Sequence, residues 1–173
     1  MTEKPASSYR EQSNVPYTKK EYITGKPASR IGFFEMGDPE GDFAVRLSLK
    51  SEEKGQIRDN ALDAARVSAN SFLQEEIGRE NYFLKLRVHP HHILRENPMA
   101  IGAGADRISD GMRKSFGRPT GLAARVSAGQ KIFVLDVVRE AYETGREALR
   151  RVRMKLPLPA SPFVEEGGEL LSR

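Results

Sequence analysis

The sequence predicts an α+β fold, an antiparallel or mixed β-sheet sandwich with two amphipathic helices packed on it. Several short segments alternate apolar and polar residues, as half-buried strands do. Two longer segments instead repeat apolar residues every three or four positions, as amphipathic helices do. Because strands dominate and the two helices are far apart in the chain, the connections favour an α+β layer over a repeating βαβ sheet.

The folded part is expected to begin with two strands, residues 30–37 and 43–50, joined by the turn-rich residues 38–42. A helix is expected from Ile57 to Ile77, with Gly78 placed to end it. The apolar stripe of this helix comprises Ile57, Ala61, Ala65, Ala69, Phe72 and Leu73. Such a stripe packs on a sheet.

Residues 82–90 again alternate as a strand, in which Lys85 and Arg87 give one face a cationic row. Residues 121–126 and 131–137 are typical of a hairpin around the turn 127–130. The second helix is expected from about Val138 to Met154, ending before Pro157. A last short strand is expected near residues 161–166.

These elements divide the chain into an extended arm (residues 1–29), a single domain (30–165) with an inserted loop at about 98–120, and an acidic tail (166–173). The arm is polar, interrupted by prolines, and combines tyrosines with neighbouring cations, a mixture that stacks on bases and neutralises phosphates. Such a composition is disordered in isolation. We therefore expect the arm to order on a large preformed RNA surface.

Charge and composition narrow the functional classes. The 173 residues carry 28 Lys and Arg against 24 Asp and Glu, but residues 82–131 hold nine cations and three anions. This asymmetry favours a polyanionic partner over evenly scattered surface charge. The absence of cysteine excludes disulfides, thiolate metal sites and cysteine nucleophiles. No apolar run approaches the roughly 20 residues that span a bilayer, so a cytoplasmic protein without a membrane partner is expected.

The stretch from Met99 to Gly121 is rich in glycine and cations, and its GAGAD element raises the question of a bound dinucleotide. Arg107 stands where that fingerprint needs a third glycine, and the preceding residues are too polar for the required buried strand. No P-loop motif is present either. Glycines allow close backbone approach, and cations offset phosphate charge. The composition therefore favours a loop inserted among phosphates, with no cofactor and no small-molecule substrate.

A histidine cluster and an arginine stripe are two further candidate sites. His89, His91 and His92 lack the fourth ligand that zinc would need, so packing or RNA contacts are expected and no metal is. In the second helix Arg139, Arg146, Arg150 and Arg153 share one stripe, opposite Ala141, Ala148 and Val152. Solvated ion pairs with Glu140, Glu143 and Glu147 are the alternative to a polyanion contact. No catalytic motif is recognised, so no enzyme is expected.

Six segments carry a family resemblance: YREQSNVPYTKKEYI, NALDAARVSANSFL, VHPHHILREN, GAGADRISDGMRKSFGRPTGLAARV, GQKIF and EALRRVRMKLP. From Tyr9 to Pro159, in this order, the chain resembles the universal L-sixteen family of large-subunit ribosomal proteins, in its archaeal and eukaryotic branch, often called L-ten-e. The lack of a long C-terminal extension resembles the archaeal form. The resemblance implies an α+β sandwich without catalytic activity, in agreement with the elements above.

The resemblance further implies binding to 23S-type ribosomal RNA, close to 5S ribosomal RNA and beside the aminoacyl-tRNA site, among other large-subunit proteins, with a role late in subunit assembly. Its central loop would point toward the peptidyl-transferase centre and the acceptor end of tRNA. A free RNA-binding regulator or an RNA-dependent enzyme is the alternative.

These expectations give two sets of candidate residues. The candidate rRNA-binding residues are Tyr9, Arg10, Tyr17, Lys19, Lys20, Tyr22, Lys85, Arg87, His89, His91, His92, Arg95, Arg118, Arg125, Arg139, Arg146, Arg150 and Arg153. The candidate loop residues near tRNA are Gly102, Gly104, Arg107, Gly111, Arg113, Lys114 and Phe116.

Overall fold

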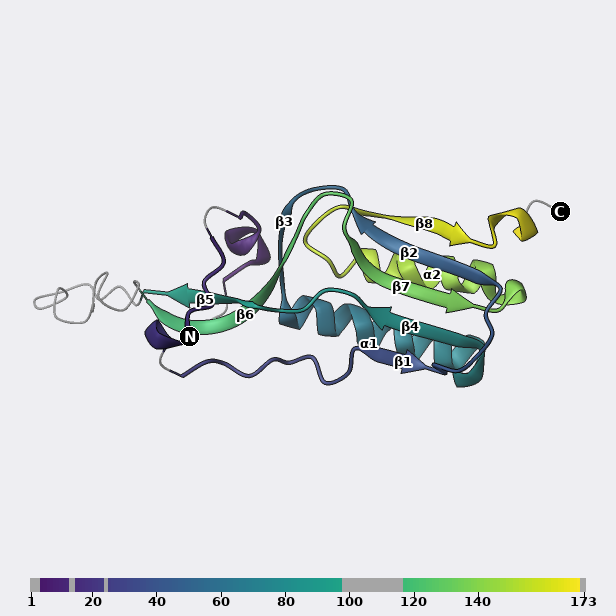
Figure 1. Ribbon diagram of the computed structural model, residues 1–173, viewed down its shortest axis with the longest axis horizontal. Helices are drawn as coiled ribbons and strands as arrows, with labels where there is room; N and C mark the ends of the chain where they lie inside the picture. Colours follow the sequence, from purple (N-terminus) through teal and green to yellow (C-terminus); the bar gives the residue numbers. More distant parts are fainter. Residues whose placement is uncertain (1–3, 13–14, 24, 98–116, 172–173) are drawn as a thin grey trace, which may run out of the picture.

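Two antiparallel sheets and two α-helices make up the domain, which confirms the predicted α+β sandwich (Figure 1). The computed structural model describes residues 4–12, 15–23, 25–97 and 117–171. Eight strands are found within these residues. The candidate loop residues from Gly102 to Phe116 lie outside them.

The larger sheet has five strands in the order β1-β4-β7-β2-β8, each antiparallel to its neighbours. Its strands are β1 (Glu35–Gly37), β2 (Val45–Ser51), β4 (Tyr82–Leu86), β7 (Lys131–Val137) and β8 (Ala160–Glu166). The smaller sheet has the order β3-β6-β5 and is also antiparallel. It consists of β3 (Gly55–Arg58), β5 (His92–Glu96) and β6 (Arg118–Val126).

The two helices are α1 (Asp59–Glu76) and α2 (Tyr142–Arg153), which pack against each other. Helix α2 also packs on β2, β7 and β8, and α1 contacts β3, β4 and β6 (Figure 1). The predicted apolar stripes are confirmed, since Ala65, Ala69 and Leu73 of α1 are fully buried. Ala148 and Val152 of α2 are buried too. Gly78 lies just after α1 with a φ of 77°, a positive value that suits glycine.

Helix α2 approaches the large sheet most closely at Gly145. A Cβ atom at this position would lie 3.1 Å from Leu47 Cδ1 and 3.3 Å from Leu135 Cδ2. A glycine therefore lets the helix backbone settle directly on β2 and β7.

The predicted hairpin between residues 121–126 and 131–137 is wrong. Strand β6 pairs with β3 and β5, whereas β7 pairs with β2 and β4 in the other sheet. The turn between them bonds to the end of β2, because Gly129 N donates to Ser51 O at 2.7 Å and Ser51 N donates to Gln130 O at 3.0 Å. The chain thus leaves the small sheet and enters the large one at this turn.

Other boundaries also differ from prediction. The first strand spans only 35–37, because the bonding partner of β1 is β4 and the ladder begins at Glu35. Ile57 belongs to β3 and not to the helix, which begins at Asp59. Strand β5 was missed, and β6 starts at Arg118, inside the span expected as loop. Four- and five-residue strands are too short to show a clear period.

Strand β4 ends at Leu86, short of the expected Pro90, but the chain continues to pair. Arg87 N donates to Ile132 O at 2.8 Å, in the large sheet, and His91 N donates to Ala123 O at 3.1 Å, in the small sheet. Residues 87–91 therefore carry the chain from one sheet to the other. The expected second helix is confirmed, with a 3-10 turn (Arg139–Ala141) before it, and β8 confirms the last strand.

Candidate nucleic-acid interface

The N-terminal arm covers both edges of the small sheet. On the β3 edge, Gln56 N donates to Arg10 O at 2.9 Å, and Gln12 Nε2 donates to the carbonyls of Gly55 and Val126. On the β5 edge, Ile93 N donates to Tyr17 O at 3.2 Å. These hydrogen bonds attach the described residues of the arm to both edges of the small sheet. That the arm becomes ordered on RNA stays a prediction.

His92 fixes the arm on the β5 side, since its Nδ1 accepts a hydrogen bond of 2.9 Å from Tyr17 N. Burial, together with the nearby positive charge of Arg125, lowers the pKa of His92 to about 4. The ring is consequently neutral near pH 7 and serves as an acceptor. It adds no charge to the surface.

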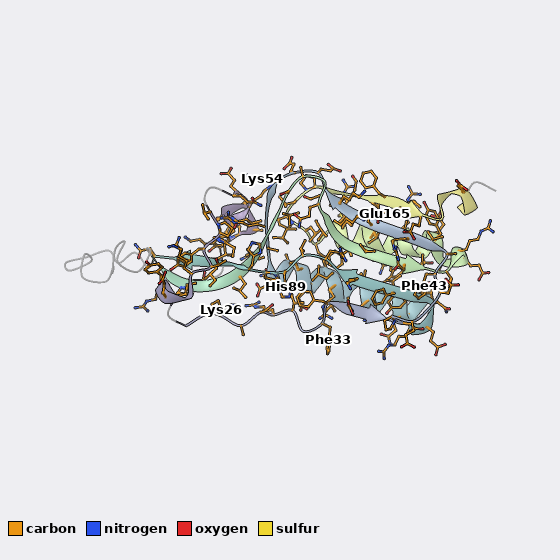
Figure 2. All side chains as sticks on the ribbon, in the orientation of Figure 1. Lys26, Phe33, Phe43, Lys54, His89 and Glu165 are labelled. Carbon is orange, nitrogen blue, oxygen red and sulfur yellow. The ribbon has the colours of Figure 1, made fainter. Side chains whose placement is uncertain are left out.

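The other two histidines have separate surroundings. The His89 ring stacks on Phe34, with ring centroids 4.2 Å apart and planes inclined by 18°. His91 Nδ1 lies 3.0 Å from His89 O. Figure 2 labels His89 and also Phe33, which is 69% exposed. The sequence did not single out Phe33, because residues 30–37 were expected to form one continuous strand.

Two arm tyrosines carry arginine side chains on their rings. The Arg95 guanidinium lies 4.1 Å from the Tyr17 ring centroid, and that of Arg58 lies 5.5 Å from the Tyr9 centroid. Arg10 forms an ion pair with Glu53. A cleft of about 260 Å³ lies between the arm and the small sheet. It is lined by a mixture of charges that includes Lys4, Arg30, Arg58, Asp59 and Glu96.

The remaining candidates on this side of the molecule are less enclosed. Lys19 and Arg118 are exposed, and Tyr22 is 47% exposed with its carbonyl accepting from Tyr17 Oη at 3.1 Å. Arg125 lies half-buried in β6. Lys20 lies in a short 3-10 turn (Lys20–Tyr22). The arm and the small sheet together thus present arginines stacked on aromatic rings.

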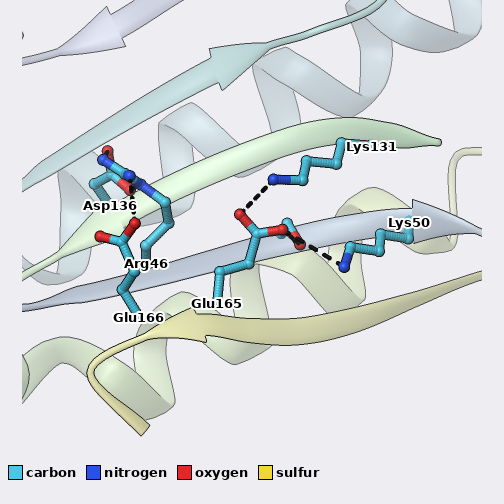
Figure 3. A network of polar contacts seen from close by, with 7 residues as sticks. Arg46, Lys50, Lys131, Asp136, Glu165 and Glu166 are labelled. Carbon is cyan, nitrogen blue, oxygen red and sulfur yellow. Dashed lines mark hydrogen bonds and ion pairs between the residues drawn. The ribbon is translucent and has the colours of Figure 1, made fainter. Parts of the chain in front are cut away.

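The outer face of the large sheet carries an ion-pair network that the sequence did not indicate (Figure 3). Arg46 Nε lies 2.7 Å from Asp136 Oδ1, and Arg46 Nη1 lies 2.9 Å from Glu166 Oε1. Lys131 Nζ lies 2.6 Å from Glu165 Oε2, with Lys50 Nζ 3.5 Å from Oε1 of the same residue. The alternation of residues along each strand places these side chains on the outer face of the sheet. Their ion-pair partners lie on strands that are far apart in the chain, so the sequence does not show the pairs.

The network favours the charged forms of Arg46 and Glu165. The hydrogen bond from Arg46 to Asp136 raises the pKa of Arg46 above its usual value. Burial raises the pKa of Glu165, but hydrogen bonds from Lys131 and Ser48 outweigh it, so this pKa lies below its usual value. Lys85 of the predicted cationic row is likewise paired, with Glu35. Within the described residues, Arg87 has no carboxylate partner.

The arginines of helix α2 and of the 3-10 turn before it have three kinds of surroundings. Arg146, Arg150 and Arg153 line a groove of about 440 Å³ together with Glu143, Glu147 and Pro162 of β8. Arg150 is bound by Glu147 through Nε at 2.7 Å and Nη2 at 2.8 Å. In the part of the chain that the structure describes, Arg146 and Arg153 have no ion-pair partner.

Two arginines lie outside this groove. The Arg151 guanidinium covers the Phe72 ring of α1 at 3.7 Å, so it contributes to helix packing. Arg139 is exposed in the 3-10 turn before the helix. The predicted four-arginine stripe therefore divides into Arg139, a paired Arg150, and two arginines free to meet an anion.

Among the described residues, no group of three or more His, Asp or Glu side chains is placed to hold a metal ion. No helix in the same residues is long and apolar enough to cross a membrane.

The structure thus defines the chain as a basic α+β protein. Arginines lie on helix α2 and on the small sheet, whose two edges are covered by the arm. Comparison with known families makes the assignment specific. The family model for "Ribosomal protein L16p/L10e" matches residues 12–162, and the chain belongs to this family. The expected family is thereby confirmed.

Curated relatives agree along nearly the whole chain. A large ribosomal subunit protein uL16 from Archaeoglobus fulgidus is 53% identical over 171 residues, 99% of this chain and 98% of the relative. The protein of the same name from Staphylothermus marinus is 53% identical over 160 residues, 92% of each chain. That of Halobacterium salinarum is 46% identical over the full length of both. These relatives support the archaeal type, and the family is structural and not enzymatic, as expected.

Proposed function

We propose that this chain is a structural constituent of the large ribosomal subunit that binds 23S-type rRNA near the aminoacyl-tRNA site. The observation that carries the proposal is the pair Arg146 and Arg153 in the groove of α2, which have no ion-pair partner among the described residues. Unpaired cations on a rigid element are suited to phosphate contacts, because no internal ion pair must first be broken. The names of the relatives and the matching family model support the ribosomal setting.

The small sheet and the arm supply a second contact region. Arginines stacked on Tyr9 and Tyr17 present flat, charged surfaces to an RNA chain, which is recognised largely through phosphates, stacking and shape. The outer face of the large sheet contributes less, since its cations are already bound by carboxylates. We assign rRNA binding to α2, the small sheet and the arm, with Arg87, directly after β4, as a further available cation.

The same proposal places 5S rRNA nearby, other large-subunit proteins as neighbours, and the residues from Gly102 to Phe116 beside the acceptor end of tRNA. It includes a role late in subunit assembly. The support for these details is the resemblance of the GAGADRISDGMRKSFGRPTG segment to its family, together with the four cations of that segment.

The direct test is binding of a structured 23S-type rRNA fragment as a function of salt. If six or more phosphates are neutralised, affinity should fall by about 10³-fold or more between 50 and 200 mM salt. Reversing charge with Arg146→Glu and Arg150→Glu should weaken binding without loss of helical signal, because both side chains are exposed. A flat salt response would refute the proposal.

The loop part of the proposal has its own test. Subunits in which residues 103–115 are replaced by a short glycine linker should bind tRNA weakly at the catalytic centre or mature poorly. The isolated variant should keep its rRNA affinity, because α2 and the small sheet are unchanged. Normal tRNA binding and normal polysome content in such subunits would argue against a place beside tRNA.

A further inference from the structure

Within the groove between α2 and β8, the three arginines are not equivalent. Arg146, Arg150 and Arg153 follow each other at four and three residues, so they lie along about 10 Å of helix at 1.5 Å per residue. The outer two have no carboxylate partner among the described residues. The middle one is bound through two nitrogens to both carboxylate oxygens of Glu147.

The two bonds to Glu147 use the Nε and Nη2 edge of the Arg150 guanidinium, a bidentate edge that could otherwise bind a phosphate. Glu147 also lies 3.6 Å from Arg151 Nε, which is anchored on Phe72. The carboxylate is thus held from two sides, and its hydrogen bond from Arg150 keeps the pKa of Glu147 below the usual value. It remains negatively charged in a groove otherwise suited to an anion.

We infer that an RNA strand lies along this groove with its phosphates on Arg146 and Arg153, while Glu147 withholds Arg150 and thereby sets the affinity. This inference rests on the proposed rRNA-binding function and adds a negative determinant to it. Glu143, at the first turn of α2, lines the same groove and bounds it with a second negative charge. The arrangement gives a contact of limited strength that is spaced over two helical turns.

The test measures how the affinity of the 23S-type rRNA fragment depends on salt in a set of single and double variants. Each phosphate contact contributes about 0.9 to the slope of log affinity against log salt. Arg146→Gln and Arg153→Gln should each lower the slope by about that amount. Arg150→Gln should leave it unchanged, because its charge is already neutralised within the protein.

The decisive comparison is a double-mutant cycle. Glu147→Gln should release Arg150, tighten binding about two- to fivefold as expected for loss of one exposed ion pair, and steepen the salt slope by about 0.9. Adding Arg150→Gln to Glu147→Gln should abolish this gain. Arg151→Gln is the matched control on the same helix, because its guanidinium packs on Phe72. It should lower the melting temperature without changing the slope.

Four outcomes would overturn the inference. If Arg150→Gln alone lowers the slope as much as Arg146→Gln does, Arg150 contacts RNA while Glu147 is present. If Glu147→Gln weakens binding, the carboxylate positions Arg150 for RNA and does not withhold it. If the wild-type slope is steep but none of the three arginine variants changes it, the groove is not the contact, although rRNA binding itself stands. A flat wild-type slope refutes rRNA binding and the inference together.

Discussion

The two sheets of this protein use their polar groups differently. The small sheet has both edges covered by the arm, and two of its arginines, Arg58 and Arg95, lie on tyrosine rings. The large sheet leaves β8 at one edge, and the cations on its outer face are bound by carboxylates (Figure 3). The number of cations that can bind a partner is therefore not the total number of cations. It is the number of cations that the fold leaves without an acidic partner.

The sheets also differ in how they are buried. Phe133 and Leu135 of the large sheet belong to the main apolar core, where both helices pack. The small sheet contributes Ile57 and Val126 to that core, whereas its Leu122 and Ile93 are buried outside it. The large sheet should therefore carry most of the global stability, and the small sheet should depend on the arm.

The largest expected effect comes from Phe133→Ala in the centre of β7. The change removes a fully buried ring and leaves a cavity, so the free energy of unfolding should fall by about 3–5 kcal/mol. Urea denaturation followed by far-UV circular dichroism measures it. Leu122→Ala in the small sheet is the comparison. An equal loss from both substitutions would contradict a larger contribution of the large sheet to stability.

A smaller and more local effect is expected for Gln12→Ala. The variant loses the hydrogen bonds to Gly55 O and Val126 O, which should weaken attachment of the arm by about 1–3 kcal/mol. Amide hydrogen exchange should then accelerate at Gln56, whose N–H is bound by the arm. The amide of Leu135 in the large sheet serves as the control. Unchanged exchange at Gln56 would mean that other contacts hold the arm.

The attachment of the arm should also depend on pH through His92. Its folded pKa of about 4 lies below the ordinary value of 6.5, so the unfolded state binds more protons between these values. The stabilising contribution is complete above about pH 6.5 and is lost as pH falls toward 4. His92→Asn retains an acceptor for Tyr17 N and should remove this part of the pH dependence. Protease sensitivity of the arm at pH 7 and pH 4.5 measures it in both proteins.

The smallest effect is expected for Lys85→Met on the outer face of the large sheet. Its ion pair with Glu35 is exposed, so the free energy of unfolding should change by about 1 kcal/mol or less. rRNA affinity should change little, because the charge is already compensated. Arg87→Met, two residues further along the chain and just after β4, should weaken binding. Equal losses of affinity from the two variants would contradict the distinction between paired and unpaired cations.

Much of this architecture could be predicted from the sequence. The periods of α1, α2, β2 and β4 are long enough to place them and their buried faces. The short strands β3 and β5 gave too few residues for a period, and Ile57 was consequently assigned to the helix. The division into two sheets could not be seen, because a tight turn at residues 127–130 is as compatible with a change of sheet as with a hairpin.

The candidate site was predictable in composition and not in pairing. Helical spacing correctly placed Arg146, Arg150 and Arg153 together, and Glu147 was among the acids considered as partners. Periodicity did not assign Arg151 to packing on Phe72, since that contact depends on how two helices meet. The ion pairs of Arg46 join residues 90 and 120 positions apart, and only the strand order brings them together.

The arm also bears on the order in which the chain folds. Gln12 bonds to Val126, which is 114 residues further along, so the first segment to be synthesised must wait for one of the last strands. Contacts of such separation form late, because closing a long loop costs entropy before any bond is made. Until then both edges of the small sheet lie open. Attachment of the arm is therefore the last step of folding. A chain without the arm would expose the edge strands of the small sheet, and exposed edge strands promote aggregation.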